Sequence, residues 1–294
     1  MPNSEIVKNF KIENSSFFPI HNLTKKMNYK EYLIVKRDGT ILRRIFLNVF
    51  DPRLREQLIF IHYITRRTKF FADSPIGFNI ISRDDPWDYK IELSTNENLN
   101  IEITSISDNH WNFEMLKSEE RLGLQSNKNE IPFHELKKLN KLFPDQNVDS
   151  LIKDYEKQNI AKTAMVPNPF YEKSTLTLGR IDYPKNKLSI IIDNVIIEKE
   201  KKKHSDKINS VLIIDNRTFT MEIDDFRNAF EELGNRFQES PFKEIWLYTG
   251  YYSANDGNEA EYNFIPLKIS KVQEKKLLKM VNEIGNKKNG IIYT

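Results

Sequence analysis

Residues 83–106 read RDDPWDYKIELSTNENLNIEITSI, and the alternation of apolar and polar side chains in this stretch predicts two strands joined by a polar turn. The first strand covers residues 89–93 and the second covers residues 99–106. Successive side chains of a strand point to opposite faces of a sheet, so the apolar side chains of each strand share one face. The opposite face of this meander therefore carries two carboxylates, Asp88 from the first strand and Glu102 from the second.

Two carboxylates on adjacent strands are a candidate site for a hard divalent cation. Mg²⁺ in proteins typically takes one or two carboxylates and completes its shell with water and with phosphate oxygens of a substrate. Asp88 and Glu102, with a backbone carbonyl between them, match that ligand set. The competing interpretation is an ordinary solvated face, because alternating strands usually expose Asp and Glu to water.

The residues before the meander predict a β-hairpin, a helix and a further strand. Residues 31–50 read as two strands around Asp38-Gly39, a strong two-residue turn signal. Asp51-Pro52 then supplies a helix N-cap and a proline at the first helical position, and this helix runs to about Thr65. A short apolar run at 78–81 predicts the next strand.

The residues after the meander alternate between helices and strands, which is the pattern of an α/β domain. Residues 108–162 are charged and helical, with prolines as breakers. No repeat or low-complexity linker marks a boundary, so we expect one compact domain, a mixed sheet flanked by helices with an N-terminal β-hairpin extension. The other predicted elements are helices at 188–203 and 224–237, strands at 210–215, 242–249 and 262–268, and a last helix from Lys271.

Composition excludes several classes of protein. At 294 residues with 39% hydrophobic side chains, the chain can bury a substantial core. It has no cysteine, which excludes disulfides and thiolate metal sites, and no apolar run reaches the roughly 18 residues that cross a bilayer. The N-terminus lacks the basic-then-apolar layout of a secretory signal, so we expect a cytoplasmic protein without membrane contact. The glycines form neither a Walker loop nor a dinucleotide fingerprint.

Basic residues are concentrated near the N-terminus. Residues 1–72 hold fourteen Lys or Arg against six Asp or Glu, although the net charge of the whole chain is only +3. Such a surface can follow a phosphate backbone, and Arg43 and Arg44 in the predicted hairpin are candidate contacts. Lys202 and Lys203, in a lysine-rich helix end, are two more. The alternative is that these charges only solvate the surface.

The order of these elements, together with short motifs, resembles the PD-(D/E)XK nuclease superfamily. Pro86-x-Asp88 followed by Glu102-Ile-Thr104 is similar to bacterial members in which a Pro-Asp-Phe segment precedes an Ile-Glu-Val-Thr strand. Those relatives continue with a helix that contains Ile-x-x-Lys and then with an apolar strand. This chain has Ile196-Ile-Glu-Lys199 and then Ser210-Val-Leu-Ile-Ile-Asp215, so the resemblance covers about residues 51–250.

The resemblance implies a restriction-endonuclease-like core at 51–268, between a basic arm and hairpin at 1–50 and a C-terminal helix at 269–294. It implies an endonuclease that hydrolyses phosphodiester bonds of DNA with Mg²⁺ or Mn²⁺ held by Asp88 and Glu102. Bacterial nucleases of this size often serve in defence against phage. The resemblance therefore also implies a nucleic-acid partner, with protein partners in a defence complex or a homodimer as further expectations.

The chain departs from the family pattern at two positions. A tryptophan separates the proline from Asp88, so Asp84 or Asp85 is an alternative ligand. Thr104 stands where the family usually places a lysine beside the attacking water, and threonine carries no charge. Either the lysine has moved, or the activity is lost and an inactive nucleic-acid-binding or assembly subunit remains.

Lys199 is the candidate for the relocated lysine. On a helix with 100° per residue it lies about 20° from Leu188, on the apolar stripe that should face the sheet. The alternative is that Lys199 extends to solvent from the helix end, where the helix dipole favours a cation. Lys90, in the first strand of the meander, is the second candidate. Some family members place an additional acid where this chain has Glu56, which the helical wheel puts opposite Leu54, Leu58 and Ile61.

Overall fold

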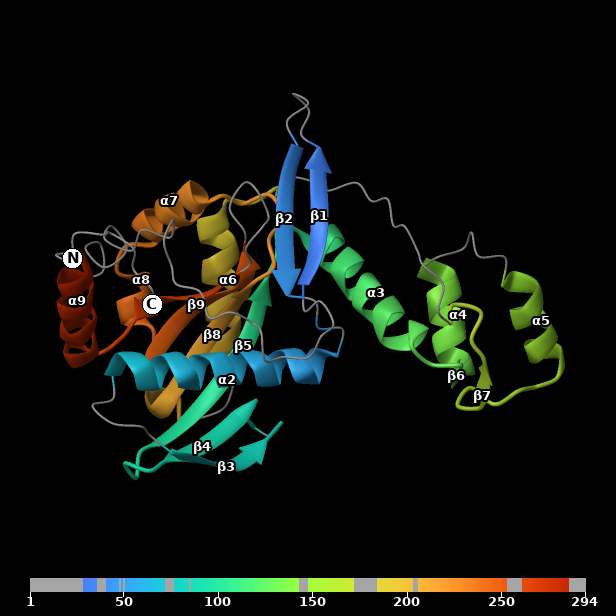
Figure 1. Ribbon diagram of the computed structural model, residues 1–294, viewed down its shortest axis with the longest axis horizontal. Coiled ribbons are helices and arrows are strands. Elements are labelled where there is room, and N and C mark those ends of the chain that lie inside the picture. The colour runs from blue at the N-terminus through green and yellow to red at the C-terminus, as the bar shows by residue number, and fades with distance from the viewer. Residues whose placement is uncertain are drawn as a thin grey trace. The chain divides into compact units, whose positions relative to one another are not determined.

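The computed structural model describes most of the chain (Figure 1). For residues 29–35 and 41–47 it describes the backbone but not the side chains. The chain divides into two compact units. The first unit comprises Met1–Asn48, Glu56–Asn109 and Asp182–Thr294, and the second comprises Val49–Arg55 and His110–Ile181. The described residues are 29–35, 41–47, 49, 51–71, 77–84, 86–142, 148–171, 184–202, 206–252 and 261–285.

The first unit is built on a six-stranded mixed sheet, which confirms the predicted α/β class. Its strand order is β10-β9-β8-β5-β4-β3. The three central strands β5, β8 and β9 run parallel, while β3, β4 and β10 pair antiparallel with their neighbours. The strands are β3 (Phe78–Arg83), β4 (Tyr89–Leu93), β5 (Asn98–Ile106), β8 (Ser210–Asn216), β9 (Glu244–Tyr252) and β10 (Glu261–Lys268).

Helices flank this sheet, as predicted. The carboxylate of Asp51 accepts the backbone N–H of Arg53 at 2.9 Å, so the first helix begins where the sequence places its cap. That helix continues to Phe71, six residues beyond the predicted end. None of the helices in the described segments is long and apolar enough to span a bilayer. The helices of this unit are α2 (Pro52–Phe71, in this unit from Glu56), α6 (Leu188–Lys201), the short 3-10 helix η3 (Lys207–Asn209), α7 (Ile223–Leu233), α8 (Arg236–Glu239) and α9 (Lys271–Gly285).

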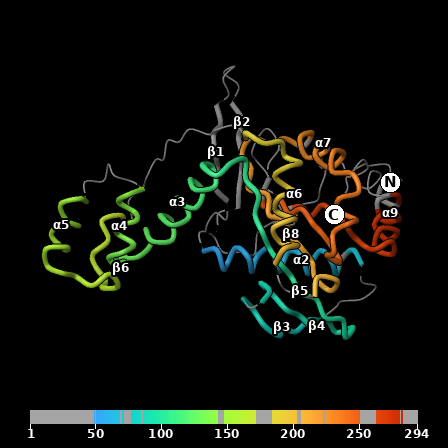
Figure 2. The backbone as a smooth tube through the Cα atoms, turned by 180° about the vertical axis from the view of Figure 1, so that it is seen from behind, coloured from blue at the N-terminus to red at the C-terminus, as the bar shows by residue number. Residues whose placement is uncertain are grey.

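Alternation along the central strands builds two hydrophobic cores, one on each face of the sheet. Ile101 of β5 packs in the cluster that contains Phe60 of α2. Leu212 of β8 packs in the other cluster, with Ile192 and Ile196 of α6. Figure 1 shows α2 crossing the strands, and Figure 2 shows α6 and α7 next to β8 from behind. The even-numbered side chains of β5 therefore point toward the α6 face.

Two further strands, β1 (Tyr29–Val35) and β2 (Ile41–Leu47), pair antiparallel with Val35 opposite Ile41. The predicted turn at Asp38-Gly39 between them lies outside the described residues. Strand β2 lies next to β9. The side chains of these two strands, including the predicted phosphate contacts Arg43 and Arg44, are not among the described side chains.

The second unit has a hydrophobic core of its own. Residues 108–162, predicted as helical with breakers, contain one short strand, in which Ile131 pairs with Val166 of a second short strand just beyond them. Strands of three residues are too short to show a period of two, so the sequence pattern missed them. Its elements are α3 (His110–Ser126), β6 (Glu130–Pro132), α4 (Phe133–Leu142), α5 (Asp149–Lys157) and β7 (Met165–Pro167), and its core residues are Leu122, Ile131, Phe133, Leu136, Leu139, Val148, Val166 and Phe170.

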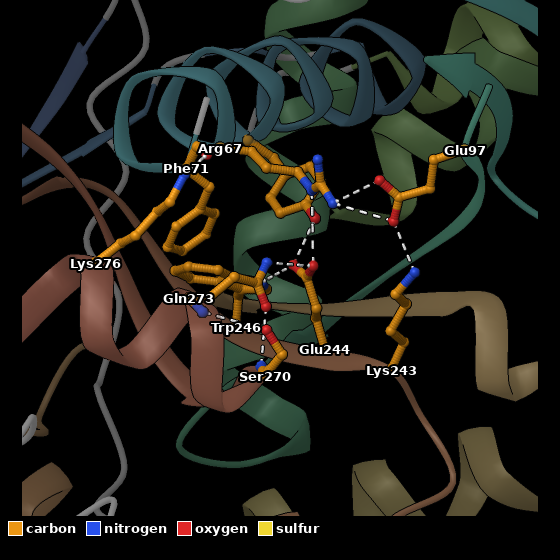
Figure 3. A network of polar contacts seen from close by, with 10 residues as sticks. Arg67, Phe71, Glu97, Lys243, Glu244, Trp246, Ser270, Gln273 and Lys276 are labelled. Carbon is orange, nitrogen blue, oxygen red and sulfur yellow. Dashed lines mark hydrogen bonds and ion pairs between the residues drawn. The ribbon is translucent and has the colours of Figure 1, made fainter. Parts of the chain in front are cut away.

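A buried polar network ties α2 and α9 to the sheet (Figure 3). Glu244 of β9 is fully buried. One of its oxygens accepts hydrogen bonds from the Tyr63 hydroxyl at 2.7 Å and from Trp246 Nε1 at 2.9 Å. The other accepts a hydrogen bond from Gln273 Nε2 at 2.8 Å, and Arg67 Nε lies 3.6 Å from it. Because donors from two helices satisfy both oxygens, we interpret this carboxylate as structural.

A buried histidine on α2 makes stability depend on pH. His62 Nδ1 lies 3.0 Å from the Tyr248 hydroxyl, and burial, reinforced by nearby Arg66, lowers the pKa of His62 to about 3. The unfolded chain returns this pKa to its ordinary value of about 6.5. Between these values the unfolded state binds the additional proton, so the stability contributed by neutral His62 is present above about pH 6.5 and is lost as pH falls toward 3.

We therefore expect the thermal midpoint of the wild type to fall between pH 6.5 and pH 4.5, and His62→Gln to weaken that dependence. Differential scanning calorimetry at closely spaced pH values measures both. His134→Gln is the control, because His134 lies in the second unit with a side chain that is 40% exposed, and it contacts the Lys162 carbonyl and Glu135. Parallel pH profiles for the wild type and His62→Gln would exclude His62 as the source.

Candidate active site

Glu102 lies in the middle of β5, on the face of the sheet that α6 covers. Its side chain points away from Ile101, as alternation predicts, but only 2% of the residue is exposed. The solvated face that alternating strands usually present is therefore absent at this position. A buried carboxylate needs charged or hydrogen-bonded partners, because burial without them is costly.

Two lysines from the end of α6 supply those partners. Lys199 donates a hydrogen bond to Oε1 of Glu102, and Lys202 donates to the same oxygen at 2.5 Å. The side chain of Lys199 is 15% exposed and that of Lys202 is 44% exposed. The apolar stripe of α6 packs on the sheet as predicted, and Lys199 continues that stripe to Glu102. Lys202, predicted as a phosphate contact, is paired with this carboxylate in the structure.

The lysines keep Glu102 ionised. Burial alone would raise the pKa of Glu102, but the hydrogen bonds from Lys199 and Lys202 outweigh burial and lower this pKa. The same pairing raises the pKa of Lys202 although partial burial opposes it. The site therefore holds an ionised Glu102 in direct contact with the charged Lys202 at neutral pH.

Asp88 lies at the start of β4, next to β5. Its Oδ2 accepts the backbone N–H of Ile103 at 2.5 Å, which fixes the carboxylate against the strand that carries Glu102. Burial raises the pKa of Asp88, and the negative charge of Glu102 raises it further, while the Ile103 N–H lowers it. Asp88 and Glu102 thus influence each other electrostatically, as two carboxylates of one site do.

Glu56 of α2 joins this environment, which the helical wheel did not predict. Leu54 and Ile61, the residues of the expected apolar stripe, are 56% and 44% exposed, and the buried face contains Phe60 instead. The stripe was assigned wrongly because apolar side chains occur all round this part of the helix. Burial raises the pKa of Glu56, and the charge of Asp88 raises it further, so the two carboxylates lie close enough to interact.

The remaining predicted residues do not meet at Glu102. Lys90 of β4 is partly buried, and within the described segments no ion pair joins it to Asp88 or Glu102. Asp84 is half exposed, has a positive φ of 69°, and forms an ion pair with Arg83 at 3.5 Å. Asp85 and Lys203 lie outside the described residues.

Asp88 and Glu102 supply two carboxylates, which is the kind of ligand that a hard divalent cation takes. Across the described residues, no group of three or more His, Cys, Asp or Glu side chains that could hold a metal ion is found. Mg²⁺ requires only one or two protein carboxylates, because water and substrate supply its other ligands. Among the described side chains and backbone groups, none engages Oε2 of Glu102 or Oδ1 of Asp88, so both oxygens are available as ligands.

Comparison of the chain with protein-family models, with characterised proteins and with solved structures finds no match. The site must therefore be interpreted from its own chemistry. That chemistry is a buried carboxylate, Glu102, next to the partly buried carboxylate of Asp88, with the side chains of Lys199 and Lys202 in contact with Glu102.

Proposed function

We propose that this protein is a nuclease of restriction-endonuclease-like fold that hydrolyses phosphodiester bonds of DNA with Mg²⁺ or Mn²⁺. The contact between Lys199 and Glu102 carries the proposal. It supplies the cation that Thr104 cannot supply, and it does so from a helix that packs on the same sheet. A Glu102 carboxylate on an ordinary solvated face would not be buried and would not require this lysine.

Asp88 and Glu102 are the residues that would hold the metal, through the two oxygens that no described donor engages. When bound there, the metal polarises the phosphoryl oxygen and lowers the pKa of a bound water. The Ile103 N–H orients Asp88, and burial between α6 and β5 excludes bulk water from Glu102. Lys199 orients the attacking water or stabilises the negative charge that develops on the phosphoryl group.

The substrate is proposed to be DNA because of the basic N-terminal third and the charge of the site. Lys199 and Lys202 balance Asp88 and Glu102, so a divalent cation adds positive charge that a phosphodiester can neutralise. The N-terminal hairpin is proposed as an additional DNA contact. A role in phage defence, with protein partners or a second copy of the chain, extends the same proposal.

A second candidate function is an inactive subunit that binds nucleic acid without cleaving it. The observation that favours it is that Lys199 and Lys202 both donate to Oε1 of Glu102. These two side chains already neutralise the carboxylate that would attract a metal. Such a protein would bind DNA, but it would neither bind a metal at Glu102 nor cleave the DNA.

Metal binding and cleavage together separate these functions. Plasmid, linear duplex and single-stranded DNA are incubated with Mg²⁺, Mn²⁺ or EDTA, and Mn²⁺ binding is measured by calorimetry on the same preparation. The proposed nuclease binds Mn²⁺ and cleaves only with metal. DNA binding without Mn²⁺ binding or cleavage supports the inactive subunit, and absence of all three contradicts both functions.

Charge reversal in the hairpin tests its contribution to DNA affinity. Arg43→Glu with Arg44→Glu is expected to weaken DNA binding and to flatten the plot of log affinity against log salt, by about 0.9 for each phosphate that the protein no longer neutralises. Fluorescence anisotropy at several salt concentrations measures the slope. Lys275→Glu with Lys279→Glu, on exposed positions of α9, is the control of equal charge. An unchanged slope in the hairpin variant would mean that Arg43 and Arg44 do not contact phosphates and serve only the solubility of the protein.

A further inference from the structure

Lys207 occupies an unusual position for a lysine at the edge of the candidate site. It begins η3, the short element between α6 and β8, and only 9% of the residue is exposed. Its ammonium lies 5.5 Å from the centre of the Phe242 ring. A lysine that is nearly buried must have partners for its ammonium group, because an unpaired buried charge is costly.

Those partners are the last backbone carbonyls of α6. Lys207 Nζ donates to the carbonyl oxygen of Lys199 at 2.8 Å and to that of Lys202 at 2.9 Å. The final carbonyls of a helix have no partner within the helix, and a cation there also interacts favourably with the helix dipole. Lys207 therefore binds the backbone of the same two residues whose side chains hold Glu102.

The other end of this connection is attached to β5. Asp206, which precedes Lys207, accepts a hydrogen bond from Asn100 Nδ2 at 3.1 Å, and Asn100 lies two residues before Glu102. The contacts thus close a ring from Glu102 through the two lysines of α6 and Lys207 back to β5. A ring of this kind fixes both lysines relative to Glu102 more firmly than their flexible side chains could alone.

We propose that Lys207 is a positioning residue for the Glu102 site, which fixes the end of α6 so that Lys199 and Lys202 meet at one oxygen of Glu102 and leave the other oxygen available. Burial lowers the pKa of Lys207, which is consistent with an ammonium enclosed by protein. The effect on cleavage rests on the proposed nuclease function, whereas the arrangement of the lysines can be measured without any activity.

Competitive labelling of lysines in the full-length protein measures that arrangement. A trace of an amine-reactive reagent is added, and mass spectrometry compares the labelling of Lys199 and Lys202 with that of Lys187. Lys187 is a suitable reference because it precedes α6 and is paired with Glu232 at 3.0 Å, independently of Lys207. In Lys207→Met, labelling of both site lysines is expected to rise by about tenfold, the equilibrium factor of one hydrogen bond to a charged group.

The structure offers a matched control in Lys268. It also donates to helix-end carbonyls, those of Gln238 at 3.3 Å and Ser240 at 2.5 Å, but it contacts neither site lysine. Lys268→Met is expected to leave their labelling unchanged, and Lys207→Arg is expected to restore part of the protection. Equal labelling of wild type and Lys207→Met, or an equal rise in Lys268→Met, would overturn the positioning role.

A second variant covers the case in which Lys207→Met does not fold. Asp206→Ala changes an exposed residue and releases the connection from Asn100, so labelling of Lys199 and Lys202 is expected to rise in the same direction. If this folded variant labels like the wild type, the ring does not position the lysines. In a cleaving protein, Lys207→Met should lower kcat by on the order of ten- to a hundredfold with little change in KM. A labelling change in a protein that never cleaves would reject the nuclease function and retain the positioning role.

Discussion

Replacing Glu102 with alanine is expected to abolish metal-dependent DNA cleavage, by at least about a thousandfold, because loss of a metal ligand removes several kcal/mol of transition-state stabilisation. Calorimetric Mn²⁺ binding should be lost in the same variant. The fold is expected to persist, since Glu102 points away from the core of the α2 face and Lys202 can turn its half-exposed side chain to water.

Two variants control for the charge and shape of Glu102. Glu102→Gln retains the size of the side chain and its ability to accept a hydrogen bond, so a loss of cleavage in this variant reports the negative charge. Glu92→Ala removes an exposed carboxylate from the same face of the adjacent strand and should cleave like the wild type. Full cleavage by a folded Glu102→Ala protein would remove Glu102 from the site.

Lys199→Met is expected to lower cleavage by at least about a hundredfold, the usual effect of losing a positioned acid-base or electrostatic group. Methionine keeps most of the aliphatic stem that packs beside Ile196 and removes the ammonium that contacts Glu102. The free energy of unfolding should change little, because Lys202 still donates to the same oxygen. Single-turnover cleavage and chemical denaturation measure the two quantities separately.

Lys201→Met is the matched control for Lys199→Met, since Lys201 is exposed on the same turn of α6. It should cleave at the wild-type rate. Full activity in Lys199→Met together with loss in Lys90→Met would move the role to the lysine of β4. Wild-type cleavage by both variants would leave no lysine mechanism for this site.

The periodicity of the sequence predicted the strands and helices that carry the site. It did not predict correctly, for every helix, which side is buried. The period of two in residues 83–106 placed Glu102 opposite Ile101, and the apolar stripe of α6 placed Lys199 toward the sheet, as the structure has them. The same reasoning failed for Glu56, because α2 has apolar side chains on several sides and only its packing on the sheet selects the buried one.

The sequence by itself determined the direction of each side chain relative to its own strand or helix, because that direction follows from a local repeat. Only the tertiary structure decided that the end of α6 covers Glu102, since ninety-seven positions separate Lys199 from Glu102. It also decided that Lys202 pairs with that carboxylate and that Lys207 binds the helix end. Contacts of this kind depend on how α6, in the connection between the paired parallel strands β5 and β8, packs on one face of the sheet, and no repeat in the sequence encodes the resulting distances.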